Sequence, residues 1–373
     1  MTVMTMKHMI AAAGSLSLLL IGAGPAAAAP LTETNVNKGV VELETMGANG
    51  ASVRIGEDLA NVIDDGATRR VLPIVGKGSL QNVIDLKALR GIDLAIVQAD
   101  VLDYARQQNL FGAIDRSFTY VTKLYNEELH LLARADIKTV ADLANQKVNV
   151  DLPGAGSGIT TRRLFELLPI AANLTNDDQG VAIEKLRKGE IAAVAFVAGK
   201  PAPLFQGLDG KDGLHLLAIP LNPAITAAFV PTRLTAQDYP GLVPADQPVD
   251  TVAVGTVLAA ANFPVNSERY RNLTNFVDAF FTRFQSLTEP GHHPKWREVN
   301  LAAELPGWTR FAPADQWLQR NAPVATVSSP DLRTIFSRFI AERQQAAGGQ
   351  AMTQQQIDEL FNQFQRWQSG QAR

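Results

Sequence analysis

The stretch "VVELETMGANGASVRIGEDLANVIDDGATRRVLPIVG" (residues 40–76) decides the fold class. Residues 40–47 alternate apolar and polar side chains and stop at a glycine, which predicts a strand, and residues 69–76 predict a second one. Between them, residues 51–65 repeat apolar side chains at helical spacing. Strand, helix and strand in this order are typical of a parallel α/β sheet.

The same alternation continues along the chain. It predicts helices over residues 78–91, 101–108, 139–146, 160–168 and 181–189, a long amphipathic helix over 267–287, and strands over 92–100, 129–136, 147–153, 190–199 and 249–260. Two α/β units, one embedded in the other, fit this pattern.

The N-terminus has the features of a secretory signal peptide. Residues 1–29 carry Lys7 and no acid, then the apolar run "MIAAAGSLSLLLIGAG" and the small residues "PAAAAP". The apolar run is too short for a membrane span, so we expect cleavage near Ala29, with a retained N-terminal anchor as the alternative. The chain has no cysteine, and therefore no lipid anchor or disulfide. We expect a free periplasmic protein of about two domains.

The charge pattern excludes nucleic acid as a partner. Lys and Arg total 34, Asp and Glu total 37, and the net charge is −3 without a long run of either sign. A nucleic-acid-binding protein would carry a basic stripe. No further apolar run of about 20 residues is present, so no other membrane span is expected.

The glycine-rich stretch "DLPGAGSGITTRRLFELL" (residues 151–168) precedes a predicted helix. It lacks the lysine of a phosphate-binding Walker loop, the third glycine of a dinucleotide fingerprint and the flanking glycines of a hydrolase elbow. Backbone N–H groups at a helix start, together with Ser157, Thr160 and Thr161, form a seat for a small anion. Gly158 is placed just before the helix. A glycine-rich turn without a ligand is the alternative interpretation.

Histidines are too scarce and too poorly spaced for catalysis or metal binding. His292 and His293 lie in "EPGHHPKW", without ligand spacing on a regular element, and a solvated loop is the better interpretation. No base and nucleophile with usable spacing is found. We therefore expect no catalytic residues, no metal and no cofactor.

The C-terminal segment is of a different kind. Two amphipathic helices are predicted, with apolar faces at Leu332, Ile335, Phe336 and Phe339 and at Ile357, Leu360, Phe361 and Phe364. A hairpin packed on the body is the plain interpretation of residues 322–373. A helix pair that binds a partner or a second copy is the sharper one.

Five stretches of the sequence carry a family resemblance that covers residues 40–321. They are "GANGASVRIGEDLA", "GKGSLQNVIDLKALRGIDLAIVQADV", "LYNEELHLLARADIKTVADLANQKVNVDLPGAGSGITT", "KLRKGEIAAVAFVAGKPAP" and "YPGLVPADQPVDTVAVGTVL". In order and spacing the chain resembles the TAXI-type solute-binding receptors of TRAP transporters. The resemblance implies a type II-like periplasmic-binding-protein fold, in which two α/β lobes close on a carboxylate-bearing solute that is delivered to a membrane permease.

The resemblance also implies the ligand-binding residues. In the first loop, Gly50, Ser52 and Arg54 occupy the family positions, but the two tyrosines and the proline of the family motif are missing. Arg54 is either a bidentate clamp for an anion or a solvated residue of the first helical turn. The other expected contacts are Ser79, Asn82, Gln98, Asp100, Ser157, Gly158, Thr160, Thr161, Phe196, Gly199 and Pro201. For Asp100, capping of the following helix is the alternative.

The lobes are predicted at residues 31–126 plus 249–321 and at residues 127–248, with hinges near "KLYNEEL" and "VDTVAV". The predicted function is capture of a small anionic solute for a TRAP-type permease, with transient docking and no chemistry. The alternatives are a binding protein that serves a sensor or an assembly, and a periplasmic enzyme.

Overall fold

The computed structural model describes residues 39–112 and 114–321. The predicted signal peptide (residues 1–29) and C-terminal helices (residues 322–373) lie outside this part of the chain. Among the described residues, no helix has both the length and the apolar character needed to cross a membrane.

One mixed sheet of ten strands organises the described residues. Its main order is β2-β1-β3-β10-β4-β7-β5-β6, and β8 and β9 pair with β4 and β10. The bounds are β1 Val40–Thr45, β2 Arg70–Val75, β3 Leu94–Gln98, β4 Phe118–Arg134, β5 Lys147–Asn149, β6 Asn173–Thr175, β7 Ala193–Ala198, β8 Leu214–Leu216, β9 Val230–Leu234 and β10 Val249–Ala261. The predicted α/β class is confirmed.

The sheet is parallel within each half, as the alternation predicts, and antiparallel at its centre. β1 pairs in parallel with β2 and β3, and β5 with β6 and β7. β10, by contrast, runs antiparallel to β3 and to β4. It enters the sheet from the opposite direction because it returns from the second half of the molecule and not through a crossover helix.

Two long strands connect the halves of the sheet. β4 has 17 residues and β10 has 13. β4 pairs with β10 from Phe118 to Glu128, and its continuation to Ala133 pairs with β7. The sheet thus has two lobes: lobe 1 is built on β1–β3 and lobe 2 on β5–β8, and β4 and β10 run through both.

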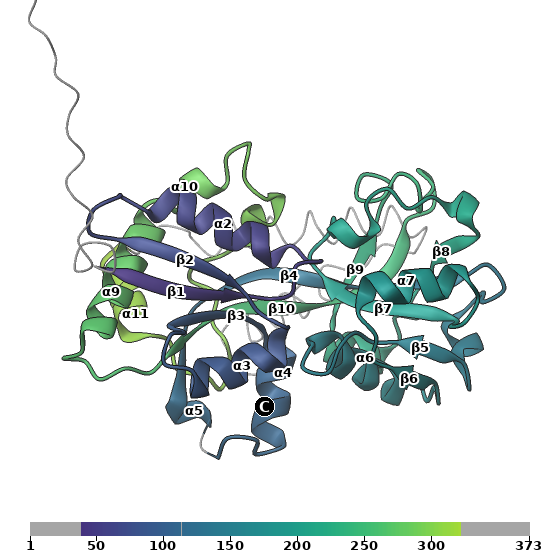
Figure 1. Cartoon of the computed structure of the whole chain (residues 1–373), viewed down its shortest axis with the longest axis horizontal. Helices are drawn as coiled ribbons and strands as arrows, with labels where there is room; N and C mark the ends of the chain where they lie inside the picture. The colour runs from purple at the N-terminus through teal and green to yellow at the C-terminus, as the bar shows by residue number, and fades with distance from the viewer. Residues whose placement is uncertain (1–38, 113, 322–373) are drawn as a thin grey trace, which may run out of the picture. The chain divides into compact units, whose positions relative to one another are not determined.

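Helices cover both faces of each half of the sheet, and α2 and α10 lie on the other side of β1–β3 from α3–α5 (Figure 1). The α-helices are α2 Ser52–Ile63, α3 Ser79–Ala88, α4 Ala99–Gln107, α5 Ile114–Ser117, α6 Gly156–Leu167, α7 Gln179–Arg187, α8 Pro223–Ala228, α9 Glu268–Thr282, α10 Phe284–Leu287 and α11 Ala312–Asn321. Short 3₁₀ helices are η1 Val140–Leu143, η2 Pro203–Phe205, η3 Gly210–Asp212 and η4 Pro294–Glu298.

Hydrophobic periodicity explains how the helices dock. In α2, Ile55, Leu59 and Ile63 recur every fourth residue, and all three are completely buried against the sheet. In α9, Phe276 and Phe280 form the same kind of stripe and pack in that core. Burial of each such side chain contributes about 1.5–3 kcal/mol relative to exposure. Lobe 2 has hydrophobic cores of its own. Each lobe is therefore packed internally and can move as a unit.

Three predicted elements differ from the structure. The long helix predicted over residues 267–287 ends at Thr282, and α10 follows it. The strand predicted from residue 129 begins at Phe118, and residues 139–146 form only the 3₁₀ turn η1. The first half of β4, residues 118–125, is rich in aromatic, valine and threonine side chains, which are typical of strands, and the prediction missed this pattern.

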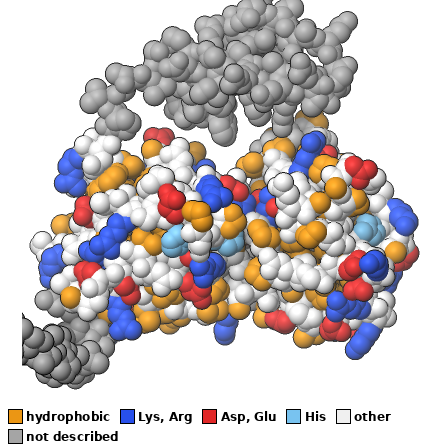
Figure 2. Space-filling model, turned by 90° about the horizontal axis from the view of Figure 1, so that it is seen from above, with side chains coloured by type: hydrophobic (Ala, Val, Ile, Leu, Met, Phe, Trp, Pro, Cys, Tyr) orange, Lys and Arg blue, Asp and Glu red, His pale blue; other side chains and the backbone are white. Residues whose placement is uncertain are grey.

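Figure 2 shows basic and acidic side chains mixed with apolar ones over one face of the molecule, without an area in which one sign dominates. This distribution agrees with the net charge of −3. Long-range electrostatic attraction of a highly charged partner is not expected from such a face.

Candidate ligand-binding site

A cavity of ≈ 300 Å³ lies between the two lobes. Lobe 1 contributes the loop after β1, the end of β2, the first residues of α3 and Gln98 at the end of β3; lobe 2 contributes the loop before α6, the start of α6 and two residues of β7. Open α/β sheets bind ligands at this edge, beyond the carboxyl ends of their strands. The volume suits a small organic molecule.

Two serines occupy matching positions on the two sides of the cavity. Ser79 begins α3, and its Oγ accepts a hydrogen bond of 2.7 Å from the backbone N–H of Gln98 in β3. Ser157 lies in the first turn of α6, and its Oγ accepts one of 3.1 Å from the N–H of Val197 in β7. Because each oxygen is used as an acceptor, each hydroxyl hydrogen remains available to donate to a ligand.

Glu127 brings a buried carboxyl group to the cavity from β4. Its Oε2 accepts a hydrogen bond of 2.7 Å from Gln98 Nε2, and Tyr125 Oη lies 3.5 Å from its Oε1. Burial is the main cause that raises the pKa of Glu127 to about 8. At neutral pH this carboxyl group is therefore mainly protonated.

Two buried polar atoms on the cavity wall have no hydrogen-bond partner among the described residues. They are Ser52 Oγ and Gln98 Oε1. Buried polar atoms are rarely left unpaired in proteins, because the loss of hydration costs about 1–3 kcal/mol. In this structure both atoms are closed off from solvent, and Gln98 Oε1 lies against Gly156.

Asp151 adds a strained backbone to the wall. Its φ is 73°, in the left-handed region that non-glycine residues seldom adopt, and its carboxylate accepts a hydrogen bond of 2.8 Å from the N–H of Leu152. Burial raises the pKa of Asp151. Residues held in such conformations cluster at functional sites.

The lobes touch directly beside the cavity. The carbonyl of Gly154, in the loop before α6, accepts hydrogen bonds from Leu80 N and Gln81 N at 2.9 and 3.1 Å, so this loop caps the start of α3. The contact is close enough to need glycine, since a Cβ on Gly156 would lie 1.6 Å from Gln98 Oε1. The glycine-rich loop is thus an interlobe contact as well as a wall of the cavity.

Six of the expected ligand-binding residues line the cavity. They are Gly50, Ser52, Ser79, Gln98, Ser157 and Phe196. Their role in binding a solute stays a prediction.

The other expected residues are not part of the cavity wall. Arg54 pairs with Asp58 at 3.1 Å and donates to the carbonyl of Gly291, so it does not reach the cavity. Asn82 is fully buried and donates to the carbonyls of Thr45 and Ile96. It ties α3 to the sheet and is not part of the cavity wall.

Asp100 and Thr160 meet each other across the lobes. Thr160 Oγ1 donates to Asp100 Oδ2 at 2.6 Å, and burial raises the pKa of Asp100 to about 6. Thr161 is completely buried. Thr160 and Thr161 belong to the second turn of α6, which begins at Gly156 and not after Gly158 as predicted.

The last three expected residues are Gly158, Gly199 and Pro201. A Cβ on Gly158 would meet Arg162 and Val150, and one on Gly199 would lie 3.0 Å from Ala51. Pro201 follows a cis peptide bond. None of the three is in the cavity wall.

Four charged wall residues were missed from the sequence: Lys77, Glu127, Asp151 and Asp178. Only Glu127 carries a signal that could have indicated it, because "NEELHLLA" places two acids before a buried apolar run. Lys77 and Asp178 are ordinary loop and helix-cap residues in sequence terms, since the Asp178 carboxylate caps α7.

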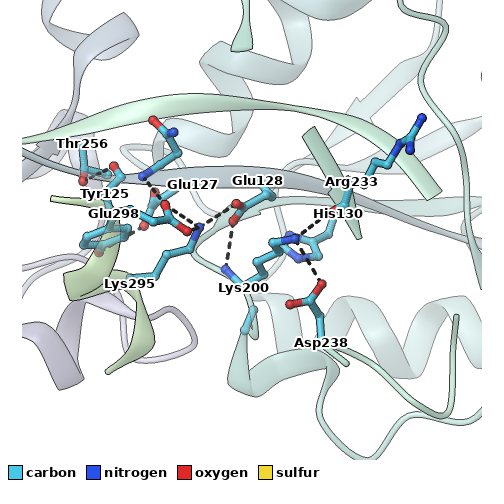
Figure 3. A network of polar contacts seen from close by, with 12 residues as sticks. Tyr125, Glu127, Glu128, His130, Lys200, Arg233, Asp238, Thr256, Lys295 and Glu298 are labelled. Carbon is cyan, nitrogen blue, oxygen red and sulfur yellow. Dashed lines mark hydrogen bonds and ion pairs between the residues drawn. The ribbon is translucent and has the colours of Figure 1, made fainter. Parts of the chain in front are cut away.

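A second polar network lies along β4, next to Glu127 (Figure 3). Lys295 of η4 is 2% exposed and lies 2.6 Å from Glu128 Oε1 and 2.8 Å from Glu298 Oε1. The other oxygen of Glu128 accepts the backbone N–H of Lys200 at 2.9 Å. One carboxylate thereby joins η4 to the segment that follows β7.

His130 ends this network. Its Nε2 lies 2.7 Å from Tyr239 Oη, and burial lowers the pKa of His130 to about 4. The ring stacks on Phe205 at 4.9 Å between centroids. His130 is therefore a neutral core residue.

The histidine pair is not in a solvated loop, contrary to expectation. Both residues are half-buried, with His292 Nδ1 3.1 Å from Asp58 Oδ1 and His293 N donating to Asp58 Oδ2. Trp296 Nε1 also donates to Asp58 Oδ2. In residues 39–112 and 114–321 no cluster of three or more His, Asp or Glu residues could hold a metal ion.

Residues 43–303 match the model of the NMT1-like family. The chain belongs to the NMT1-like family. This match spans both lobes and the whole cavity, so the NMT1-like core includes every element that contributes to the site.

Solved structures similar to this NMT1-like chain include the periplasmic binding protein BugD, with 13% identity, 75% of this chain and 93% of that chain covered, and a TM-score of 0.47. Another is the alkanesulfonate-binding protein SsuA from Xanthomonas axonopodis pv. citri bound to MOPS, with 14% identity, 82% and 93% covered, and a TM-score of 0.44. At this level of similarity no ligand is transferred to this protein.

Proposed function

We propose that this protein is a periplasmic receptor that captures a small carboxylate-bearing solute and presents it to a TRAP-type membrane permease. The observation that carries the proposal is the pair of serines, Ser79 and Ser157, which line one cavity from two lobes and use their oxygens only as acceptors of backbone N–H groups. Helix starts next to such hydroxyls favour an anionic group. The family match supports a solute-binding role.

Capture without chemistry agrees with the cavity wall. No histidine lies among the described residues that form it, and the oxygens of Ser79 and Ser157 accept backbone N–H groups, not a neighbouring base. A serine nucleophile needs a base that removes its proton. The wall therefore offers hydrogen bonds and shape, and neither serine is paired with a base.

The predicted lobe boundaries fit this role. We propose a hinge where the chain passes from residues 31–126 into 127–248 and returns at 249–321. In support, β4 pairs along one edge with β10 up to Glu128 and along the other edge with β7 from Glu128 onward, and β10 begins at Val249. Bending of both strands near these points would open the cavity.

Native mass spectrometry of protein isolated from periplasm tests the capture. We expect a small molecule to co-purify, and we expect Ser79→Ala and Ser157→Ala to lose it. Thr274→Ala is the matched control, since its hydroxyl donates to the carbonyl of Tyr270 within α9, far from the cavity lining. Absence of any bound molecule in the unaltered protein would contradict the proposal.

Uptake measurements test the partner. Deletion of the permease and deletion of this receptor should abolish uptake of the same solute. If uptake continues without the receptor while a transcriptional or chemotactic response is lost, the receptor serves a sensor instead.

A further inference from the structure

A second cavity, of ≈ 910 Å³, lies on lobe 1 and has no lining residue in common with the cavity between the lobes, as far as the chain is described. Its walls are α11, the loop of residues 299–310, the start of α10 and Tyr120 of β4, and we call it the α11 groove. The large apolar side chains of these walls are Phe284, Leu301, Leu305, Trp308, Trp317 and Leu318. An apolar groove of this kind fits the face of an amphipathic helix.

The walls of the α11 groove are fixed by the core of lobe 1. Trp317 packs edge-on against Phe281 of α9, with ring centroids 5.3 Å apart. Phe311, just before α11, donates its backbone N–H to the carbonyl of Tyr120 at 2.8 Å. Arg310 donates to carbonyls of the loop at 2.8 and 2.9 Å. The groove is therefore formed in advance, and binding in it does not require the walls to become ordered.

The last described residues lie in this groove. Gln319 and Asn321, in the last turn of α11, are part of its lining, and residues 322–373 follow. Ten residues, 322–331, precede Leu332, and fully extended they span at most about 33–36 Å. An apolar face that begins at Leu332 is thus held near the groove at an effective concentration on the order of millimolar.

The sequence that follows this linker has the spacing that a groove for a helix requires. Leu332, Ile335, Phe336 and Phe339 stand at positions i, i+3, i+4 and i+7, which lie on one face of a helix. Helices that bind in apolar grooves place their anchor residues at these positions.

The charges of the two partners are complementary. Arg333 and Arg338 stand on either side of the apolar face of the predicted helix. The groove carries Glu304 and Asp315 at exposed positions. Arg310 is the one basic residue in the described lining, and its guanidinium is directed at backbone carbonyls. Arginines beside the apolar face would therefore meet acidic side chains at the edge of the groove.

We propose that residues 332–339 dock as a helix in the α11 groove of their own chain, with the apolar face against Trp308, Trp317 and Leu318. A second copy and a separate protein are the competing occupants, but neither is tethered within reach of the groove. This inference does not depend on which solute the cavity between the lobes binds.

Hydrogen exchange of the full chain tests the docking. Phe336→Asp places a charge in the apolar face, and Thr334→Asp, the matched control, places the same charge on the opposite side of the helix. Loss of one buried phenylalanine corresponds to about 10- to 150-fold in a docking equilibrium. Amides of α11 and of residues 299–310 should therefore exchange about 10-fold faster or more in Phe336→Asp and at an unchanged rate in Thr334→Asp. Exchange in α7 should not change in either variant, which excludes general unfolding.

Engineered cysteines test the contact directly, because the natural chain has none. Ala302 is an exposed residue of the groove. Ala302→Cys combined in turn with Leu332→Cys, Ile335→Cys or Phe339→Cys should give an intramolecular disulfide under mild oxidation in at least one pair. Ala302→Cys combined with Thr334→Cys should form it about 10-fold more slowly or not at all.

Three outcomes would overturn the inference. The first is an unchanged exchange rate of α11 in Phe336→Asp, or an equal increase in both aspartate variants. The second is crosslinking by Thr334→Cys as fast as by every residue of the apolar face, which would indicate a free tether. The third is a disulfide between two chains in place of one within a chain, which would assign the groove to a second copy.

Discussion

Replacement of Lys295 by methionine measures what the buried ion pair beside the cavity contributes to stability. Lys295 and Glu128 are 2% and 3% exposed, and their charged atoms lie 2.6 Å apart. Methionine keeps most of the side-chain volume but removes the charge. The variant therefore leaves the Glu128 carboxylate buried without its cation, which in other proteins costs about 3–5 kcal/mol.

The protonation of Glu128 sets an upper limit on this cost. Without Lys295 the folded protein can protonate Glu128, and at pH 7 this costs about 3.4 kcal/mol, at 1.36 kcal/mol for each pH unit above the ordinary pKa of 4.5. At pH 5 the same step costs only about 0.7 kcal/mol. Burial already raises the pKa of Glu128 in the unaltered protein although Lys295 opposes the shift, and removal of Lys295 raises this pKa further. The stability of the variant is therefore retained at low pH and lost as the pH rises.

We therefore expect Lys295→Met to lose about 3 kcal/mol at pH 7 and about 1 kcal/mol at pH 5, measured by urea unfolding at both pH values. Lys185→Met is the control, since the Lys185–Asp177 pair is 35% and 28% exposed and should cost less than about 1 kcal/mol. An equal loss at pH 5 and pH 7, or a loss at pH 7 no larger than in the control, would refute this reasoning.

Four further predictions concern the site and its surroundings. Ser157→Ala should weaken binding of the co-purified solute about 10-fold or more in calorimetry. Thr161→Ala should leave the affinity unchanged, since Thr161 is buried outside the cavity. Equal effects of the two substitutions would place the ligand elsewhere. Gly156→Ala should displace the Gln98 amide and lower the free energy of unfolding by about 1–3 kcal/mol, and an unchanged urea midpoint would show that the interlobe contact is loose. Burial lowers the pKa of His130 to about 4 in the folded protein, whereas the unfolded chain binds this proton near pH 6.5. The free energy of unfolding should therefore fall by about 3 kcal/mol as the pH drops from 6.5 to 4. Titration of the His130 ring near pH 6.5 in NMR would contradict this. Arg54→Ala should not change solute affinity, and a large loss would restore the clamp interpretation.

Local periodicity predicted most of the elements of lobe 1. β1, α2, β2 and α3 each show their own apolar pattern, and each lies within a few residues of its expected bounds. The position of β10 was not predictable in this way. Its apolar run identifies a strand, but its insertion between β3 and β4 depends on contacts with residues more than a hundred positions away.

The site was predicted in part for a similar reason. Ser79 and Ser157 follow glycines at helix starts, so their position near a ligand edge is visible in the sequence. Asp100 and Thr160 carry the same kind of polar group, yet the packed lobes bring them to each other at 2.6 Å. Whether a hydroxyl faces a solute or another side chain is decided by tertiary packing and has no local signal.

The place of β10 in the sheet also constrains how the protein is made. Until residues 249–261 are free to pair, the centre of the sheet lacks its middle strand, and the edges of β3 and β4 stay unpaired. Pairing at such sequence separation is slow, and unpaired edges invite association between chains. About two thirds of the polypeptide therefore precedes the strand that completes the sheet, and chaperones should be needed most before this strand has paired.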